Sequence, residues 1–133
     1  MAMGFRFPAL RRLLSLLCLS LCLGASVAQA QSMADKIDYL GSSRHLQITG
    51  LKSKVIDGML NLSIEVFNSD NEDQQGYYRL DWLDDSGFPV WGEEAWKPIL
   101  LHGEQKLHLP IVAPTPKARD FKIEFSGEKN FAN

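Results

Sequence analysis

Hydrophobic and polar residues alternate along much of the chain after residue 43, which is the period-two pattern of half-buried β-strands. The clearest run covers residues 60–66, where leucine, isoleucine and valine occupy every second position. Asp57 and Gly58 come directly before it, and both residue types tolerate the positive φ angles of a tight hairpin turn. Comparable alternation occurs at residues 45–49, 77–82, 107–111 and 121–125.

The spacing of these runs predicts an all-β fold. Turn-forming residues recur about every 8–12 positions without a helical period, a combination typical of antiparallel sandwiches. We therefore predict an antiparallel, immunoglobulin-like β-sandwich of about six to eight strands, with short strands also at residues 88–91 and 99–101. Trp82 suits this layout because immunoglobulin domains bury a tryptophan on a central strand. Pro110 cannot donate to a ladder, so its strand is expected at a sheet edge or at the end of its pairing. A small closed barrel is the alternative.

The first 30 residues have the composition of a secretory signal. Three arginines precede a leucine-rich run at residues 13–27, and Ala28 and Ala30 are small residues at the positions that signal peptidase reads. We expect cleavage between Ala30 and Gln31. A spanning anchor needs about 20 apolar residues, which is longer than this run, so no stable membrane span is expected after cleavage.

Both cysteines, Cys18 and Cys22, lie in this leader. Each follows a bulky leucine, whereas lipid attachment requires a small residue directly before the cysteine. The mature chain should therefore lack thiols and fold without a disulfide. The chain divides into four predicted segments: a cleaved signal at 1–30, a flexible lead-in at 31–43, the sandwich at 44–126 and a tail at 127–133.

The predicted mature chain is acidic. All 16 Asp and Glu but only 11 of the 14 Lys and Arg follow residue 30, which gives a net charge of −5 with neutral histidines. Affinity for nucleic acid and for anionic lipid depends on clustered basic residues, so neither is an expected partner.

Three motifs give a family resemblance. Residues 76–84 (GYYRLDWLD) with Gly87, then Trp96, then residues 112–121 (VAPTPKARDF) resemble the YcfL family, and an apolar strand closing on Asn68 fits the same pattern. The resemblance covers about residues 45–126. It implies a periplasmic β-sandwich of the Gram-negative cell envelope and no established activity. Members are often lipoproteins with a cysteine at the cleavage site, and its absence here favours a soluble periplasmic form.

The sequence offers no convincing catalytic, metal or cofactor site, so we expect a protein that is not an enzyme. Zinc requires three or four converging ligands, whereas the three histidines are widely spaced. Clustered carboxylates could hold calcium, but Asp near glycine also forms ordinary solvated turns, which we prefer. The residues considered are His45, His102, His108, Asp70, Glu72, Asp73, Asp81, Asp84 and Asp85.

Large aromatic residues give the best functional lead. Tyr77, Phe88, Trp91 and Trp96 are close in sequence around a segment rich in turn residues. Trp91 and Trp96 could cap one end of the core, which is the interpretation we prefer, or the exposed aromatics could form a surface that anchors a protein or stacks on sugar rings. The expected function is a non-catalytic periplasmic binding or adaptor protein whose partner is another envelope protein. A cell-wall saccharide is the alternative ligand, and a small hydrolase is the least favoured function.

Overall fold

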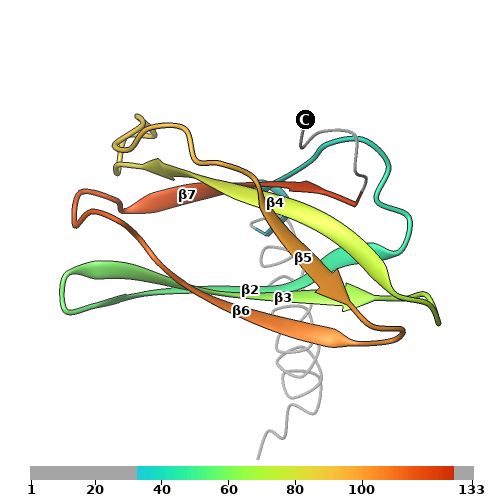
Figure 1. Cartoon of the computed structure of the whole chain (residues 1–133). Coiled ribbons are helices and arrows are strands. Elements are labelled where there is room, and N and C mark those ends of the chain that lie inside the picture. The colour runs from blue at the N-terminus through green and yellow to red at the C-terminus, as the bar shows by residue number, and fades with distance from the viewer. Residues whose placement is uncertain (1–32, 128–133) are drawn as a thin grey trace, which may run out of the picture. The chain divides into compact units, whose positions relative to one another are not determined.

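Two sheets packed face to face contain all the strands of the described chain (Figure 1). The computed structural model describes residues 33–127, so the predicted signal peptide and most of the predicted tail lie outside it. The chain divides after Asp35, and the unit that begins at Lys36 holds the sandwich. Its strands are β1 (Ile37–Tyr39), β2 (Leu46–Ile56), β3 (Met59–Asn68), β4 (Gln74–Leu83), β5 (Lys97–Leu101), β6 (Lys106–Val112) and β7 (Asp120–Ser126).

The strand order confirms the predicted sandwich. One sheet has the order β1-β7-β4-β5 and the other β2-β3-β6. All neighbours are antiparallel except β1 and β7, which run parallel. The order β2-β3-β6 corresponds to immunoglobulin strands A, B and E, and β5-β4-β7 corresponds to C′, C and F. The position that strand G takes in an immunoglobulin domain is filled here by β1.

The core consists of the inward-facing residues of both sheets. Leu80 and Trp82 of β4 are almost completely buried, and Trp82 therefore takes the place of the immunoglobulin strand C tryptophan. The alternation seen in residues 60–66 buries every second residue of β3, as predicted. Other buried hydrophobic residues of the strands include Ile37, Leu46, Ile48, Ile99, Leu101, Phe121, Ile123 and Phe125.

Two glycines meet specific backbone requirements. Asp57 and Gly58 have φ angles of 50° and 78° and form the two-residue turn between β2 and β3, which confirms the predicted hairpin. Gly76 lies where the Leu46 side chain and the backbone of β7 approach β4 closely. A Cβ there would be 2.9 Å from the Leu46 side chain and 3.0 Å from the Ser126 carbonyl oxygen, so a larger residue would force the strands apart.

Two predicted boundaries differ from the structure. The segment 31–43, expected to be a flexible lead-in, contributes β1, whose Ile37 is buried and pairs with Ile123 of β7. The sandwich thus begins before residue 44. Residues 88–91 do not form a strand, because only an isolated bridge joins Leu83 to Pro89.

The predictions for residues 99–101 and Pro110 are confirmed. Residues 99–101 lie within β5, and Pro110 lies in β6 at a sheet edge. Within residues 33–127 there is no helix of the length and apolarity needed to cross a membrane.

Candidate interaction surface

The segment between β4 and β5, residues 84–96, is the aromatic loop. Its first half is held by its own backbone and by Asp84, whose carboxylate accepts hydrogen bonds from the backbone amides of Ser86 and Phe88, both at 2.9 Å. The amide of Val90 donates to the Trp82 carbonyl at 2.9 Å. Asp84 therefore acts as a turn former whose Oδ1 accepts both hydrogen bonds, which agrees with the interpretation as a solvated turn.

Glu94 anchors the second half of the loop to the core tryptophan. The Trp82 indole Nε1 donates to Glu94 Oε1 at 2.9 Å, and Lys97 Nζ donates to Glu94 Oε2 at 3.1 Å. A buried indole N–H requires an acceptor. Here that acceptor comes from the loop, so the burial of Trp82 and the position of residue 94 depend on each other.

Arg79 connects the same half of the loop to the outer face of the four-stranded sheet. Its guanidinium pairs with Glu124 of β7 and with Glu93 of the loop, and lies over the ring of Trp96 at 4.6 Å from the centroid. The hydrogen bond that Arg79 donates to Glu124, followed by the one that it donates to Glu93, raises the pKa of Arg79. Arg79 therefore stays charged and joins β4, β7 and the loop.

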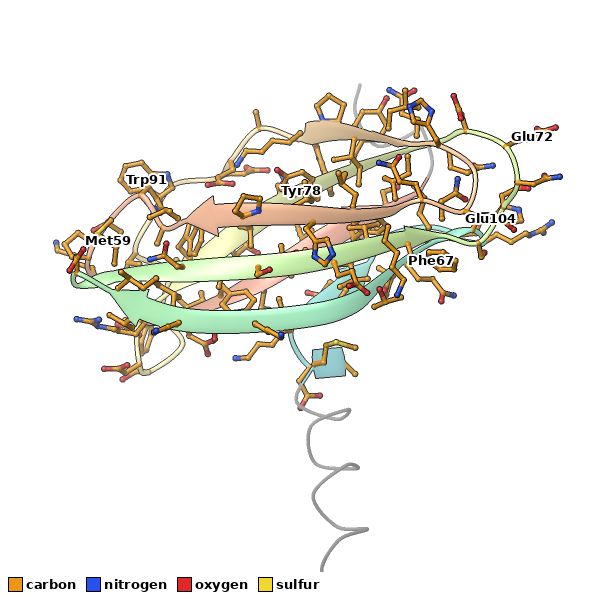
Figure 2. All side chains as sticks on the ribbon, turned by 90° about the horizontal axis from the view of Figure 1, so that it is seen from below. Met59, Phe67, Glu72, Tyr78, Trp91 and Glu104 are labelled. Carbon is orange, nitrogen blue, oxygen red and sulfur yellow. The ribbon has the colours of Figure 1, made fainter. Side chains whose placement is uncertain are left out.

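The four aromatic residues singled out from the sequence have two different environments. Phe88 is 69% exposed and Trp91 is 52% exposed, and both project from the aromatic loop (Figure 2 labels Trp91). Trp96 is half-buried against Arg79, and Tyr77 is half-buried on β4 opposite Pro98 and Ser126. The preferred prediction that Trp91 and Trp96 both cap the core is therefore wrong for Trp91, which is exposed as Phe88 is, and fits only the half-buried Trp96.

The sequence pattern did not predict that Arg79, Glu93 and Glu94 anchor the aromatic loop. Alternation with Leu80 and Trp82 places Arg79 on the outer face of β4, which is the one signal that the sequence contains. The partners of Glu93 and Glu94 follow from how the loop crosses the sheet, and no local pattern specifies that path.

The histidines and acidic clusters do not form a metal site. Within the described part of the chain, no three His, Cys, Asp or Glu side chains gather closely enough to hold an ion. Each histidine instead lies near a separate carboxylate. The ring-to-carboxylate distances are 3.7 Å for His45–Asp70, 3.0 Å for His102–Asp73 and 3.5 Å for His108–Glu65.

A shallow cavity of about 220 Å³ is lined by Tyr39, Ser43 and Gln47. The Tyr39 hydroxyl accepts a hydrogen bond from the Ile48 amide at 3.1 Å, and its ring meets Phe125 edge-on at 5.9 Å. The cavity is smaller than typical ligand pockets, which span about 300–1,000 Å³. Its polar groups serve the packing of β1 against β2.

Comparisons with known proteins agree with this fold. A family model described as "Protein of unknown function (DUF1425)" matches residues 29–126. The crystal structure of the Campylobacter jejuni protein cj0090 is similar, with a TM-score of 0.62, 18% identity and coverage of 70% of this chain and 98% of that one. The crystal structure of a DUF1425 family member from Shewanella sp. pv-4 has a TM-score of 0.56, 23% identity and coverage of 65% and 82%. None of the curated proteins matches the sequence.

Proposed function

Because the chain belongs to the DUF1425 family, for which no function is known, we propose from its own surface that it is a non-catalytic binding or adaptor protein of the periplasm. We further propose that it is a YcfL-like member and that its partner is another envelope protein. One observation carries the proposal: Phe88 and Trp91 are exposed on a loop that is otherwise tightly anchored.

The anchoring matters because a mobile loop would lose entropy on binding. Hydrogen bonds to Asp84 and Glu94 and the contacts of Arg79 fix the loop before any partner arrives. Preorganisation of this kind improves affinity by reducing the cost of ordering side chains. Tryptophan is enriched among the few residues that dominate protein interfaces, so Trp91 is the expected centre of the contact.

Photo-crosslinking in the living cell tests the proposal. A photoreactive amino acid at position 91 of the exported chain should give a discrete adduct with one envelope protein. Lys117 is the matched control position, because it is exposed in the turn between β6 and β7 and lies outside the aromatic loop. Phe88→Ser should abolish the adduct from position 91 without lowering the melting temperature, since the Phe88 side chain is largely solvent-exposed. Equal crosslinking from positions 91 and 117 would contradict the proposal.

A saccharide ligand is the second candidate, because the exposed ring of Trp91 could stack on a sugar. Titration with cell-wall fragments to millimolar concentration, followed by tryptophan fluorescence, separates the two. Saccharide binding predicts a saturable change in emission that disappears in Trp91→Phe. An adaptor protein predicts no change with wall fragments and a specific protein adduct.

A further inference from the structure

The exposed half of β2, residues 51–56, forms an open strand edge. β2 lies at the end of the three-stranded sheet and has β3 as its neighbour. Its pairing with β3 continues without interruption from Gly50 to the hairpin turn, so this half is fully ordered. Residues 52–56 are all exposed, and Figure 1 shows the β2–β3 hairpin reaching the end of the molecule.

The hairpin geometry determines which backbone groups face outward. In a two-residue hairpin with both turn residues at positive φ, the closing pair Ile56–Met59 exchanges hydrogen bonds, and hydrogen-bonded pairs then alternate along the ladder. Lys54 and Lys52 therefore bond to β3. The amides and carbonyls of Leu51, Ser53 and Val55 point away from it, toward the position that another strand would take.

The other sheet edges are less suited to accept a strand. β5 contains Pro98 and β6 contains Pro110, and each proline removes one backbone donor. β1 has three residues. Residues 51–56 contain no proline, so this segment offers the longest open ladder among the described strands.

The side chains of this edge differ between its two faces. The register pairs Leu51 with Ile64 and Val55 with Leu60, so these two side chains share the core face of the sheet, where Val55 is 47% exposed. Lys52 and Lys54 share the outer face. Both are exposed, and the ion pairs found among residues 33–127 do not include them. Ser53 lies between the two apolar side chains on the core face, and Ile56 follows the lysines on the outer face. An arriving strand would thus meet Leu51 and Val55 on one face and two positive charges on the other.

These charges distinguish between possible occupants. If two copies of β2 paired antiparallel about Ser53, Lys52 of one copy would face Lys54 of the other, and like charges directly opposite each other are destabilising. We propose that β2 instead accepts an extended, proline-free segment of another protein whose apolar and acidic side chains alternate. That segment would add a strand to the sheet beside Leu51–Val55. This surface extends the proposed binding function and lies on the opposite sheet from the aromatic loop.

Binding of designed peptides tests this proposal. The probe is a nine-residue peptide that alternates valine or threonine with glutamate, and the matched control replaces each glutamate with lysine. The acidic peptide should bind at least tenfold more tightly than the control and should weaken as salt rises. Amide exchange at Leu51, Ser53 and Val55 should slow on binding, because their outward amides become hydrogen-bonded.

Variants of the domain test whether the peptide binds at the open edge of β2. Ser53→Pro removes an outward amide and should abolish binding, while its circular dichroism spectrum and melting curve report whether the sheet persists. The double variant Lys52→Glu/Lys54→Glu changes only exposed side chains, so its sheet should persist. It should bind the basic peptide more tightly than the acidic one. Trp91→Ala should bind the acidic peptide as well as the wild type does, so failure of the aromatic-loop proposal and failure of this one are distinguishable.

Three results would overturn the proposal: equal affinity for both peptides, binding that persists unchanged in the double variant, or loss of binding in Trp91→Ala. A dimer in solution that dissociates in Ser53→Pro would also overturn it, since a second copy would then be the occupant.

Discussion

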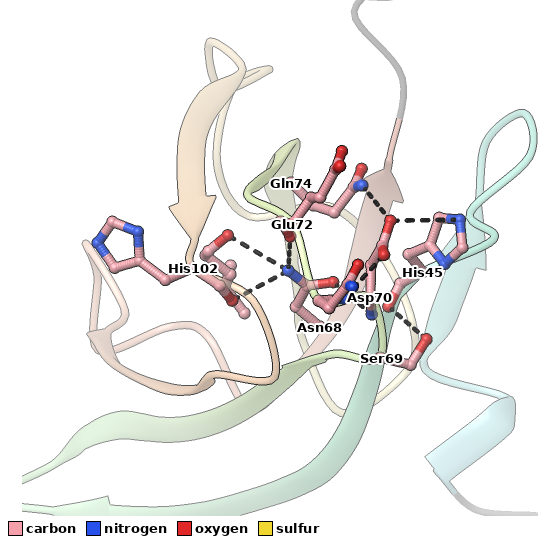
Figure 3. A network of polar contacts seen from close by, with 9 residues as sticks. His45, Asn68, Ser69, Asp70, Glu72, Gln74 and His102 are labelled. Atoms are coloured by element: carbon pink, nitrogen blue, oxygen red, sulfur yellow. Dashed lines mark hydrogen bonds and ion pairs between the residues drawn. The ribbon is translucent and has the colours of Figure 1, made fainter.

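At the scale of single residues, Asn68 shows how a buried polar side chain can hold two loops together (Figure 3). It is completely buried, and its amide nitrogen donates to the carbonyls of Glu72 at 2.8 Å and His102 at 3.0 Å. Its side-chain oxygen accepts from the amide of Asp70 at 2.9 Å. Asn68 thus joins the loop after β3 to the turn after β5, and satisfying a buried amide in this way avoids a large desolvation cost.

Asn68→Asp should therefore be strongly destabilising. A carboxylate cannot donate to the two carbonyls and would lie close to their negative ends. We expect the free energy of unfolding to fall by about 2–4 kcal/mol, measured by urea denaturation at neutral pH. Asn61→Asp is the control, because Asn61 is only half-buried and donates to one carbonyl, that of Met59, at 2.9 Å. An equal loss in both variants would contradict the role given to Asn68.

Asp81 gives a prediction for pH dependence. Although Asp81 is exposed, desolvation of its carboxyl by neighbouring groups, followed by the nearby charge of Glu124, raises the pKa of Asp81 above its ordinary value. The folded protein then binds the Asp81 proton more tightly than the unfolded chain does, so this residue lowers stability as pH rises above about 4. Below that pH the carboxyl is neutral in both states and the effect is absent.

Asp81→Asn should consequently be more stable than the wild type at pH 7, and the difference should shrink to zero on acidification to about pH 3. Urea unfolding across this pH range measures it. A variant that is less stable than the wild type at neutral pH would show that Asp81 is held by favourable contacts instead.

At the scale of elements, periodicity predicted the strands well and the loops poorly. Residues 60–66, 77–82 and 121–125 alternate because each strand has one face on the core, and each of these predictions is confirmed. The aromatic loop has no such constraint. Residues 88–91 are expected to form a short strand, but the loop takes its path from contacts with Arg79 and Trp82 on β4.

The same lack of local constraint limited the prediction of the site. Sequence neighbours such as Trp91 and Trp96 have similar chemistry, yet one is exposed and the other is half-buried beside Arg79. What separates them is a guanidinium contributed from β4. Composition could therefore nominate the four aromatics but could not divide them into packing and exposed groups.

Arg79→Met should loosen the second half of the aromatic loop. The variant loses the contacts to Glu93, Glu124 and the ring of Trp96, so amide exchange over residues 90–96 should become faster and tryptophan emission should shift to longer wavelength. The loss in the free energy of unfolding should be about 1–2 kcal/mol, since the guanidinium is mostly buried and makes charged hydrogen bonds. Arg119→Met is the control, because Arg119 is exposed and its side chain is not among the ion pairs of the described chain. Unchanged exchange in Arg79→Met would show that Glu94 alone fixes the loop.

At the scale of the whole molecule, β1 completes the four-stranded sheet by pairing with β7, which lies at the opposite end of the described chain. The Leu40 amide donates to the Phe125 carbonyl and the Ile123 amide to the Lys36 carbonyl, both at 2.8 Å. Lys36 also pairs with Asp120 at 2.6 Å. The sequence predicted a flexible segment here, because a three-residue strand is too short to establish a period. Its order depends on pairing with the edge of β7.

Ile37→Ala should accordingly reduce the stability of the whole sandwich. Deleting a buried isoleucine side chain typically costs about 2–4 kcal/mol, and the effect should appear as a single shifted transition in thermal unfolding. Asp38→Ala is the matched control on the adjacent, exposed position and should change stability little. If Ile37→Ala had the same melting temperature as the wild type, β1 would not contribute to the stability of the sandwich.

The parallel pairing of β1 with β7 also determines how the domain would respond to a mechanical load. These two strands are the first and last of the sandwich, and they run in the same direction side by side. Tension applied through the chain on either side would slide one strand along the other, so their ladder bonds would share the force instead of breaking one after another. The fold should therefore resist stretching as a stiff link between whatever is attached at its two ends.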